Sequence, residues 1–385
     1  SSAGVVTNRG TLAVDANPAP FATNGSDEVF ITSGDTGYVL TLSTNVLTTE
    51  VADVTMGGHV DGFFVALDAT TGTLKISESG DGTTWDATQI QQRSAAADPW
   101  IAMLVVRREI YLFGNKTGEV WFNAGNSPFP FAQRSGSFFE IGIAARWSLA
   151  SFGDSLAWLG RSKGGGPAVY ALSGYTPVKI SNLGVDWAIQ QYEDAGVIDD
   201  AIGWSYTRLG HVFYVLEFPQ QGRTWVYDLT TSQWHERGKW ESSANDFLTY
   251  RPRFQASAFG HNLVCDRSAP RMYRFRETVY TDVDGEVLRR VRRVPHLSNE
   301  NRRLFVDSVE LECERGVGLS AGQGSDPLVG MRMSFDGGYT WSNERTRSLG
   351  ALGNYSQRVR WDRCGAGRNP MLELVCTDPV AVNLF

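Results

Sequence analysis

Paired short strands dominate this 385-residue sequence between residues 28 and 275. Six times, two segments rich in aromatic and β-branched residues flank a turn that contains glycine or proline, as expected of a β-hairpin. The predicted pairs are 28–32 with 38–42, 63–67 with 73–77, 110–113 with 119–122, 156–159 with 168–172, 211–218 with 224–229, and 262–265 with 272–275. Their spacing is irregular but close to the length of a four-strand blade. The pattern therefore predicts an all-β, irregular β-propeller of about six blades.

Glycine and aromatic residues support this interpretation. The chain has 41 glycines, 12 tryptophans, 13 tyrosines and 20 phenylalanines, which suit tight turns and pleated strand surfaces. Residues 212–216 are apolar throughout, as expected for an inner strand covered on both faces. One helix is expected in a connection between blades, because apolar residues recur there at helical spacing. These residues are Val185, Ala188, Ile189 and Tyr192, with Ser181 or Asn182 as the N-cap.

The pattern changes near residue 286. Val309 and Leu311 alternate with polar neighbours, and so do Val359 and Trp361, which is typical of strands with one face in solvent. Residues 286–385 contain 14 arginines, no lysine and 12 acidic residues, which gives them a net charge of +2. Because the whole chain has a net charge of −7, residues 1–285 have a net charge of −9. We therefore predict two domains, a β-propeller over residues 1–285 and a C-terminal antiparallel, β-sandwich-like module over residues 286–385. Whether the N-terminal blade is complete stays open.

The arginines gather at the start of the second predicted domain. Arginine forms bidentate and stacked contacts that lysine cannot form, so a segment with arginine as its only basic residue favours a protein interface. The candidate interface residues are Arg289, Arg290, Arg292, Arg293, Arg302 and Arg303. They would contact a partner ring or exiting DNA. A solvated connector between the two domains explains the same run equally well, and both interpretations stay open.

Residues 334–341 read S-F-D-G-G-Y-T-W and fit the Asp-box pattern, and residues 79–85 carry a looser version. The pattern residues are Ser334, Asp336, Gly338, Thr340 and Trp341. In such a box the aspartate caps the amides of a turn between two strands, glycine takes a positive φ, and tryptophan packs beneath. The motif predicts a structural turn and carries no information about a reaction.

Metal, cofactor and nucleotide sites find no support in the sequence. The histidines and cysteines lack the spacings of metal ligands. They are His59, His211, His235, His261, His296, Cys265, Cys313, Cys364 and Cys376. No Gly-x-Ser-x-Gly elbow or Gly-x-x-x-x-Gly-Lys loop occurs, and no apolar run approaches the roughly 18 residues of a membrane span. We expect no enzymatic activity, no cofactor and no membrane insertion, and the net charge of −7 argues against wrapping of nucleic acid.

An ordered series of strings resembles one phage family. Residues 107–122 (R-R-E-I-Y-L-F-G-N-K-T-G-E-V-W-F) and 142–160 look like its blade strands, and residues 216–238, with Val-Tyr-Asp followed by Trp and Gly, are similar to its later hairpin. The Asp box followed by R-V-R-W-D-R-C-G (358–365) resembles its C-terminal module. The family is that of the packaged-DNA stabilisation proteins, the tail hub proteins of short-tailed double-stranded DNA phages.

The resemblance implies a virion protein assembled in the host cytoplasm as a self-associated ring of six. Its partners would be the portal-adaptor protein, the tail needle and the tailspikes, and DNA would only pass through its channel. Family members carry roughly one blade of chain upstream of the matched part, and the sequence begins Ser-Ser-Ala-Gly without a methionine, so we expect the true start to lie upstream.

Two other function classes stay open. Asp boxes recur in glycosidase propellers, so a sialidase-like hydrolase with an arginine triad, a Tyr–Glu nucleophile pair and an aspartic acid is one alternative. The nearest candidate for its arginine element, Y-R-P at residues 250–252, stands in the wrong order relative to the boxes. A glycan-binding adhesin is the other alternative.

Overall fold

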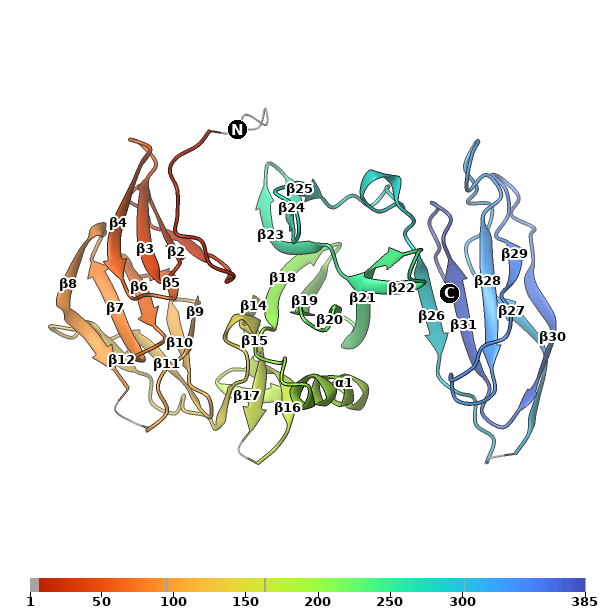
Figure 1. Ribbon diagram of the computed structural model, residues 1–385, viewed down its shortest axis with the longest axis horizontal. Coiled ribbons are helices and arrows are strands. Elements are labelled where there is room, and N and C mark those ends of the chain that lie inside the picture. Colours follow the sequence, from red (N-terminus) through yellow and green to blue (C-terminus); the bar gives the residue numbers. More distant parts are fainter. Residues whose placement is uncertain (1–6, 94–95, 163, 301, 385) are drawn as a thin grey trace. The chain divides into compact units, whose positions relative to one another are not determined.

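The computed structural model describes residues 7–93, 96–162, 164–300 and 302–384 (Figure 1). The chain divides into two compact units. The first unit is Ser1–Gly238 with Thr249–Arg274, and the second unit is Lys239–Leu248 with Phe275–Phe385. The boundary predicted at residue 285 stays a prediction. The described residues form eight antiparallel sheets, six of them built from consecutive strands between residues 21 and 274.

The first three sheets each have four strands in sequence order. The first contains β1 (Phe21–Thr23), β2 (Glu28–Ser33), β3 (Thr36–Thr41) and β4 (Val46–Ala52). The second contains β5 (Met56–Val60), β6 (Phe63–Asp68), β7 (Thr73–Glu78) and β8 (Asp81–Gln92). The third contains β9 (Ala102–Val106), β10 (Glu109–Phe113), β11 (Gly118–Asn123) and β12 (Phe131–Gln133).

The next three sheets have five, five and three strands. The fourth contains β13 (Ile141–Ile143), β14 (Ala150–Phe152), β15 (Ser155–Ser162), β16 (Pro167–Ser173) and β17 (Thr176–Lys179), with a short 3-10 helix at Arg146–Ser148. The fifth contains β18 (Ile202–Arg208), β19 (His211–Phe218), β20 (Arg223–Asp228), β21 (Gln233–Glu241) and β22 (Asp246–Thr249). The sixth contains β23 (Pro252–Ala258), β24 (His261–Asp266) and β25 (Met272–Arg274).

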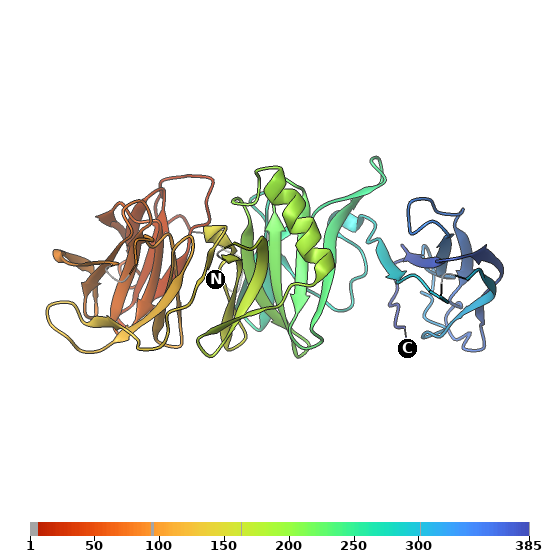
Figure 2. The ribbon, with the colours of Figure 1, turned by 90° about the horizontal axis from the view of Figure 1, so that it is seen from below.

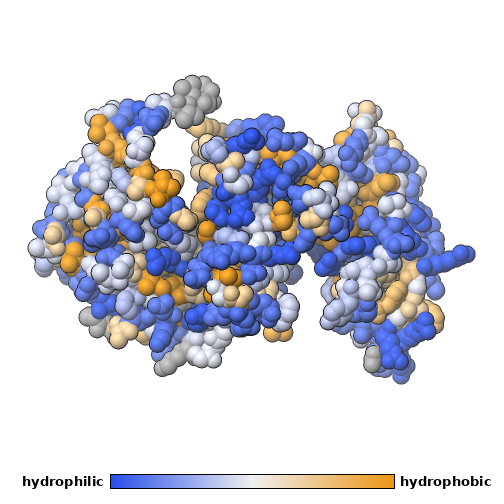
Figure 3. Space-filling view, viewed as in Figure 1, coloured by the Kyte–Doolittle hydropathy of each residue, from blue (hydrophilic) through white to orange (hydrophobic). Residues whose placement is uncertain are grey.

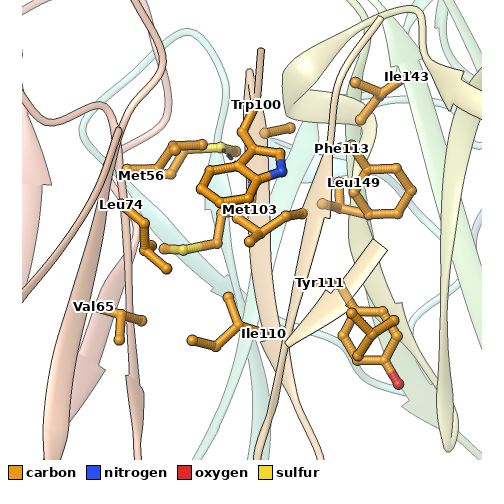
Figure 4. Close-up of a cluster of buried hydrophobic side chains, with 14 of the residues drawn as sticks. Met56, Val65, Leu74, Trp100, Met103, Ile110, Tyr111, Phe113, Ile143 and Leu149 are labelled. Carbon is orange, nitrogen blue, oxygen red and sulfur yellow. Dashed lines mark hydrogen bonds between the residues drawn. The ribbon is translucent and has the colours of Figure 1, made fainter. Parts of the chain in front are cut away.

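Successive sheets of the first unit contact one another through their first or second strands. The contacts run from β1 and β2 to β5, then to β9, β14, β18 and β23. Large apolar side chains fill the spaces between neighbouring sheets. Figure 4 shows Val65 and Leu74 of the second sheet facing Met103 and Ile110 of the third, beside fully buried Trp100. Burial of each such side chain stabilises the fold by about 1.5–3 kcal/mol, so the core is distributed along the series of sheets.

All six predicted hairpins are confirmed, as the pairs β2–β3, β6–β7, β10–β11, β15–β16, β19–β20 and β24–β25. The predicted helix is also confirmed as α1 (Leu183–Asp194), which lies against β16 (Figure 2). Asn182 is its N-cap and accepts a hydrogen bond from the amide of Val185 at 3.0 Å. The hydroxyl of Ser181, the other candidate, instead donates to Asp186 at 2.6 Å.

The second unit holds two further sheets and a 3-10 helix at Val283–Gly285. One sheet orders β26 (Arg290–Val294), β31 (Met371–Cys376), β28 (Leu328–Ser334) and β29 (Arg345–Ser348). The other pairs β27 (Leu304–Leu311) with β30 (Val359–Gly367). The predicted alternation is confirmed, because Val309 pairs with Trp361, which is fully buried in the core of this unit. The predicted all-β architecture is therefore confirmed for both units.

Candidate functional site

The first arginine of the predicted interface stacks on an aromatic ring. The guanidinium of Arg289 lies 4.4 Å from the centroid of the Trp240 ring, and Trp240 also contacts Phe247 at 5.0 Å between centroids. Lys239 forms an ion pair with Glu286 at 3.1 Å. Residues 239–248 comprise the end of β21, the turn after it and most of β22. These contacts fasten them to residues 275–385, with which they form the second unit.

Arg290 holds the C-terminal segment of the chain. Its guanidinium donates to the backbone carbonyls of Val380 at 2.6 Å and Asp378 at 2.5 Å, and one amino group lies 3.4 Å from the sulfur of Cys376. Burial raises the pKa of the Cys376 thiol despite the nearby guanidinium, so this cysteine stays protonated at neutral pH. Arg290 therefore acts as a connector within the second unit.

Arg293 belongs to an ion triplet across three strands. Its Nε donates to Glu373 at 2.7 Å, and Arg332 on the opposite strand donates to the other carboxylate oxygen at 2.8 Å. Burial alone would raise the pKa of Glu373, but the hydrogen bonds from both arginines hold that pKa below its usual value. Trp341 of the Asp box lies 5.6 Å from each guanidinium, so the box and the triplet form one structural cluster.

The other three arginines lie at the surface, as does the 62% exposed side chain of Arg293. Arg292 is exposed, Arg302 forms an exposed ion pair with Glu300 at 3.5 Å, and the guanidinium of Arg303 lies 5.5 Å from the ring of exposed Phe305. The structure therefore gives Arg289, Arg290 and Arg293 partners within the second unit, whereas Arg292, Arg302 and Arg303 lie at exposed positions. Their assignment as an interface stays a prediction.

The Asp-box turn connects β28 to β29. The Asp336 carboxylate accepts hydrogen bonds from the amide of Thr340 at 2.9 Å, from its hydroxyl at 2.5 Å, and from the hydroxyl of Ser334 at 2.8 Å. The Thr340 hydroxyl and amide bonds lower the pKa of Asp336 to about 2. Gly338 has a φ of 95° and donates its amide to Ser334 at 2.9 Å. Both carboxylate oxygens of Asp336 therefore accept hydrogen bonds from within the turn itself.

The looser box at residues 79–85 lies at the start of β8. Asp81 accepts hydrogen bonds from the amide and hydroxyl of Thr83, at 2.8 Å and 2.6 Å. The indole of Trp85 donates to the carbonyl of Gly82 at 2.8 Å, and its ring lies 5.3 Å from that of Phe30. Here too the aspartate shapes a turn and the tryptophan packs on the neighbouring sheet.

Two buried ion networks were not anticipated from the sequence. Arg93, in the connection after β8, is 2% exposed and contacts Glu119 of β11 at 3.2 Å and Asp98 at 3.5 Å. Glu217 of β19 is 1% exposed and contacts Arg253 at 2.6 Å and Arg267 at 3.0 Å. The available signal was an acidic residue inside an apolar strand, since such a residue needs a cationic partner. Both networks fasten one sheet to the next segment of chain.

In the part of the chain that the structure describes, no group of side chains is arranged as a catalytic site. A surface cavity of about 370 Å³ lies beside Arg93 and Asp98, and one of about 500 Å³ lies beside Phe305 and Arg363. The described residues contain no cluster of three or more metal-ligating side chains, and none of their helices is long and apolar enough to cross a membrane. On the face shown in Figure 3, hydrophilic residues surround small separate apolar patches.

Comparison with known proteins gives two family matches. A family model described as bacteriophage P22 Gp10, β-propeller, matches residues 1–280, and one described as bacteriophage P22 Gp10, β-sandwich, matches residues 289–384. No curated protein matches the sequence. Among solved structures, the N-terminal domain of Nup159 aligns with 9% identity over 64% of this chain and 72% of that chain, at a TM-score of 0.36.

Proposed function

Because the chain belongs to the family of bacteriophage P22 Gp10, the packaged-DNA stabilisation protein of short-tailed phages, we propose that it docks below the portal-adaptor ring, retains the packaged genome and anchors the tail needle and tailspikes. It is a phage tail structural protein with a β-propeller followed by a β-sandwich. The observation that carries the proposal is the pair of family matches, which cover residues 1–280 and 289–384 in this order.

The construction of the first unit suits a part that carries load. Neighbouring sheets pack against one another in series, so the inner strands of the second to fifth sheets are protected from local opening. The buried networks around Glu119 and Glu217 add cross-links between successive segments. A block of this kind transmits force from pressurised DNA without loss of its secondary structure.

The proposed assembly is a ring of six copies in the virion, put together in the host cytoplasm, with DNA passing through the channel. The net charge of −9 on residues 1–285 would keep exiting DNA from adhering to channel walls formed by this region. Exposed Arg292, Arg302 and Arg303 remain candidates for contacts with a neighbouring subunit or the adaptor. The function needs no cofactor and no catalysis.

Mass photometry tests the proposal. Purified protein mixed with the portal-adaptor protein of the same phage should give ring-sized complexes, whereas persistent monomers that never bind the adaptor would overturn it. Hydrolysis across a panel of chromogenic glycosides would identify a glycosidase instead. Saturable binding on a glycan array would identify an adhesin.

A further inference from the structure

Helix α1 presents an apolar projection to solvent. The helix lies on the outside of the fourth sheet, against β16 (Figure 2). Val185 and Ile189 are buried on its inner side, whereas Leu183 and Trp187 are 87% and 68% exposed. Residues four apart lie on the same side of a helix, so these two side chains form one projection, called the knob below. Tryptophan is one of the residues that most often dominate the energy of an interface, so the knob marks a contact surface.

Acidic residues surround the knob. Residues 180–207 contain five acidic residues and no basic one. Two of the five form ion pairs with basic residues from earlier strands, but Asp194 and Asp199 are exposed. Asp194 stands seven residues after Trp187 and therefore lies on the same side of α1, two turns further on. A surface that fits the knob must combine apolar or aromatic side chains with positive charge.

The second unit has a cavity of this kind between β27 and β30. Their pairing shifts from Val306–Gly365 to Ser308–Asp362, and a surface cavity of about 500 Å³, called the hole below, lies at this irregularity. Its size is within the range of ligand pockets, about 300–1,000 Å³. The side chains that line the hole include Phe305, Val306, Arg360, Arg363, Asp307 and Asp362.

Guanidinium groups outnumber carboxylates around the hole. Arg360 contacts Asp362 at 2.8 Å, and the guanidinium of Arg303 lies 5.5 Å from the centroid of the Phe305 ring, which is 72% exposed. With the other two charged lining residues, the hole has three positive and two negative groups. Guanidinium groups attract both the face of an indole ring and carboxylates. The hole therefore matches the knob in polarity and in charge.

We propose that the knob of one copy enters the hole of a second copy, and that this contact, repeated head to tail, joins the copies of the ring. The proposal rests on the proposed function, because the ring is taken from it. Head-to-tail association of identical copies requires an interface between two different surfaces of the same chain. The knob belongs to the first unit and the hole to the second, so every copy carries both surfaces.

The charges favour this occupant over the others. Two knobs in contact would bring the exposed carboxylates of Asp194 and Asp199 together. DNA at the hole would meet the carboxylates of Asp307 and Asp362 beside the arginines. A different virion protein bound at the knob leaves the hole unexplained, and one bound at the hole leaves the knob unexplained. One contact between copies accounts for both surfaces.

Sedimentation velocity of the purified protein over a range of concentrations tests the contact. The knob variant is W187A and the hole variant is F305T. Both side chains are largely exposed, alanine favours helices and threonine favours strands, so both variants should melt like the wild type. The controls F21T and Y339A remove aromatic side chains that are 70% and 90% exposed, one in each unit.

We expect the wild type and both controls to form species larger than a monomer as the concentration rises, and each variant to associate about thirtyfold more weakly or less. An equimolar mixture of W187A and F305T is the sharpest sample. The intact knob is then present only on F305T and the intact hole only on W187A, so the mixture should form dimers and nothing larger. Recovery of the dimer also shows that both variants are folded.

A wild type that stays monomeric, variants that associate like the wild type, or a mixture that forms no dimers would overturn the contact. Binding of the wild type to phage heads that carry the portal and adaptor but lack this protein is measured in parallel. Association of the wild type without binding to these heads would count against the proposed function and leave the contact standing. Binding to heads without association through the knob would overturn the contact alone.

Discussion

Replacement of Glu217 by glutamine should loosen the sixth sheet and leave the rest of the first unit intact. The sixth sheet, β23–β25, has three strands, and among its described residues Val264 is the buried apolar side chain. None of the four hydrophobic clusters includes a residue of this sheet. Besides the contacts between β18 and β23, its attachment to the fifth sheet relies on the Glu217 carboxylate, which binds Arg253 and Arg267.

The expected cost follows from the burial of the three groups. Removal of one partner from a fully buried ion pair costs about 3–5 kcal/mol, and loss of an exposed pair costs about 0–1 kcal/mol. Glu217 is 1% exposed, but Arg253 and Arg267 are 21% and 23% exposed and keep some contact with water. We therefore expect E217Q to cost about 3 kcal/mol, which increases local opening on the order of a hundred-fold.

Hydrogen–deuterium exchange followed by mass spectrometry measures this opening segment by segment. Peptides from residues 252–274 should exchange faster in E217Q, while peptides from the second and third sheets keep their protection. The matched control is E236Q in the same sheet as Glu217, because the Arg223–Glu236 pair at 3.3 Å is 35% and 42% exposed and should be worth roughly 0.5 kcal/mol or less. Unchanged exchange in residues 252–274, or equal acceleration throughout the unit, would refute the reasoning.

Three further substitutions test other parts of the structure. Gly203→Ala would place a Cβ 2.0 Å from a backbone carbonyl oxygen, so it should lower the free energy of unfolding by about 3 kcal/mol in calorimetry. The control Gly25→Ala, whose Cβ would have no atom within 4 Å, should melt like the wild type. Asp336→Asn should lower the melting temperature of the second unit at pH 7. Because the folded pKa of about 2 lies below the unfolded value of 3.8, this difference should persist above about pH 4 and vanish as the pH falls through about 2. Trp240→Ala removes the ring under Arg289 and should speed proteolysis between residues 239 and 289, and an unchanged cleavage rate would contradict that role.

The central hairpins were predictable because their strands are covered on both faces. Burial of β10 and of most of β19 requires nearly continuous apolar sequence, which is visible without knowledge of the fold. The later strands gave no such signal, since β8 is long and largely exposed and β21 is only half-buried, and both are rich in polar residues. Sequence therefore predicts the centre of each sheet better than its edge.

In the candidate site, contacts between residues close in sequence were predictable, and contacts between residues far apart in sequence were not. The Asp box was recognisable because the partners of Asp336 lie within four residues of it. The arginine run was not resolvable into separate roles, because the partners of Arg290 and Arg293 lie 80 or more residues further along the chain. Pairing of β26 with β31 brings those partners together, and nothing in the run itself specifies that pairing.

Retention of the packaged genome is the central claim, and a nuclease-protection assay tests it most directly. DNA-filled heads that lack this protein are incubated with the purified wild-type protein and then treated with nuclease, and the protected genome is quantified. The account predicts that heads without the protein lose most of their DNA to the nuclease and that added protein restores protection in proportion to the copies bound. Heads that bind the protein but remain unprotected, or that keep their genome without it, would contradict the account.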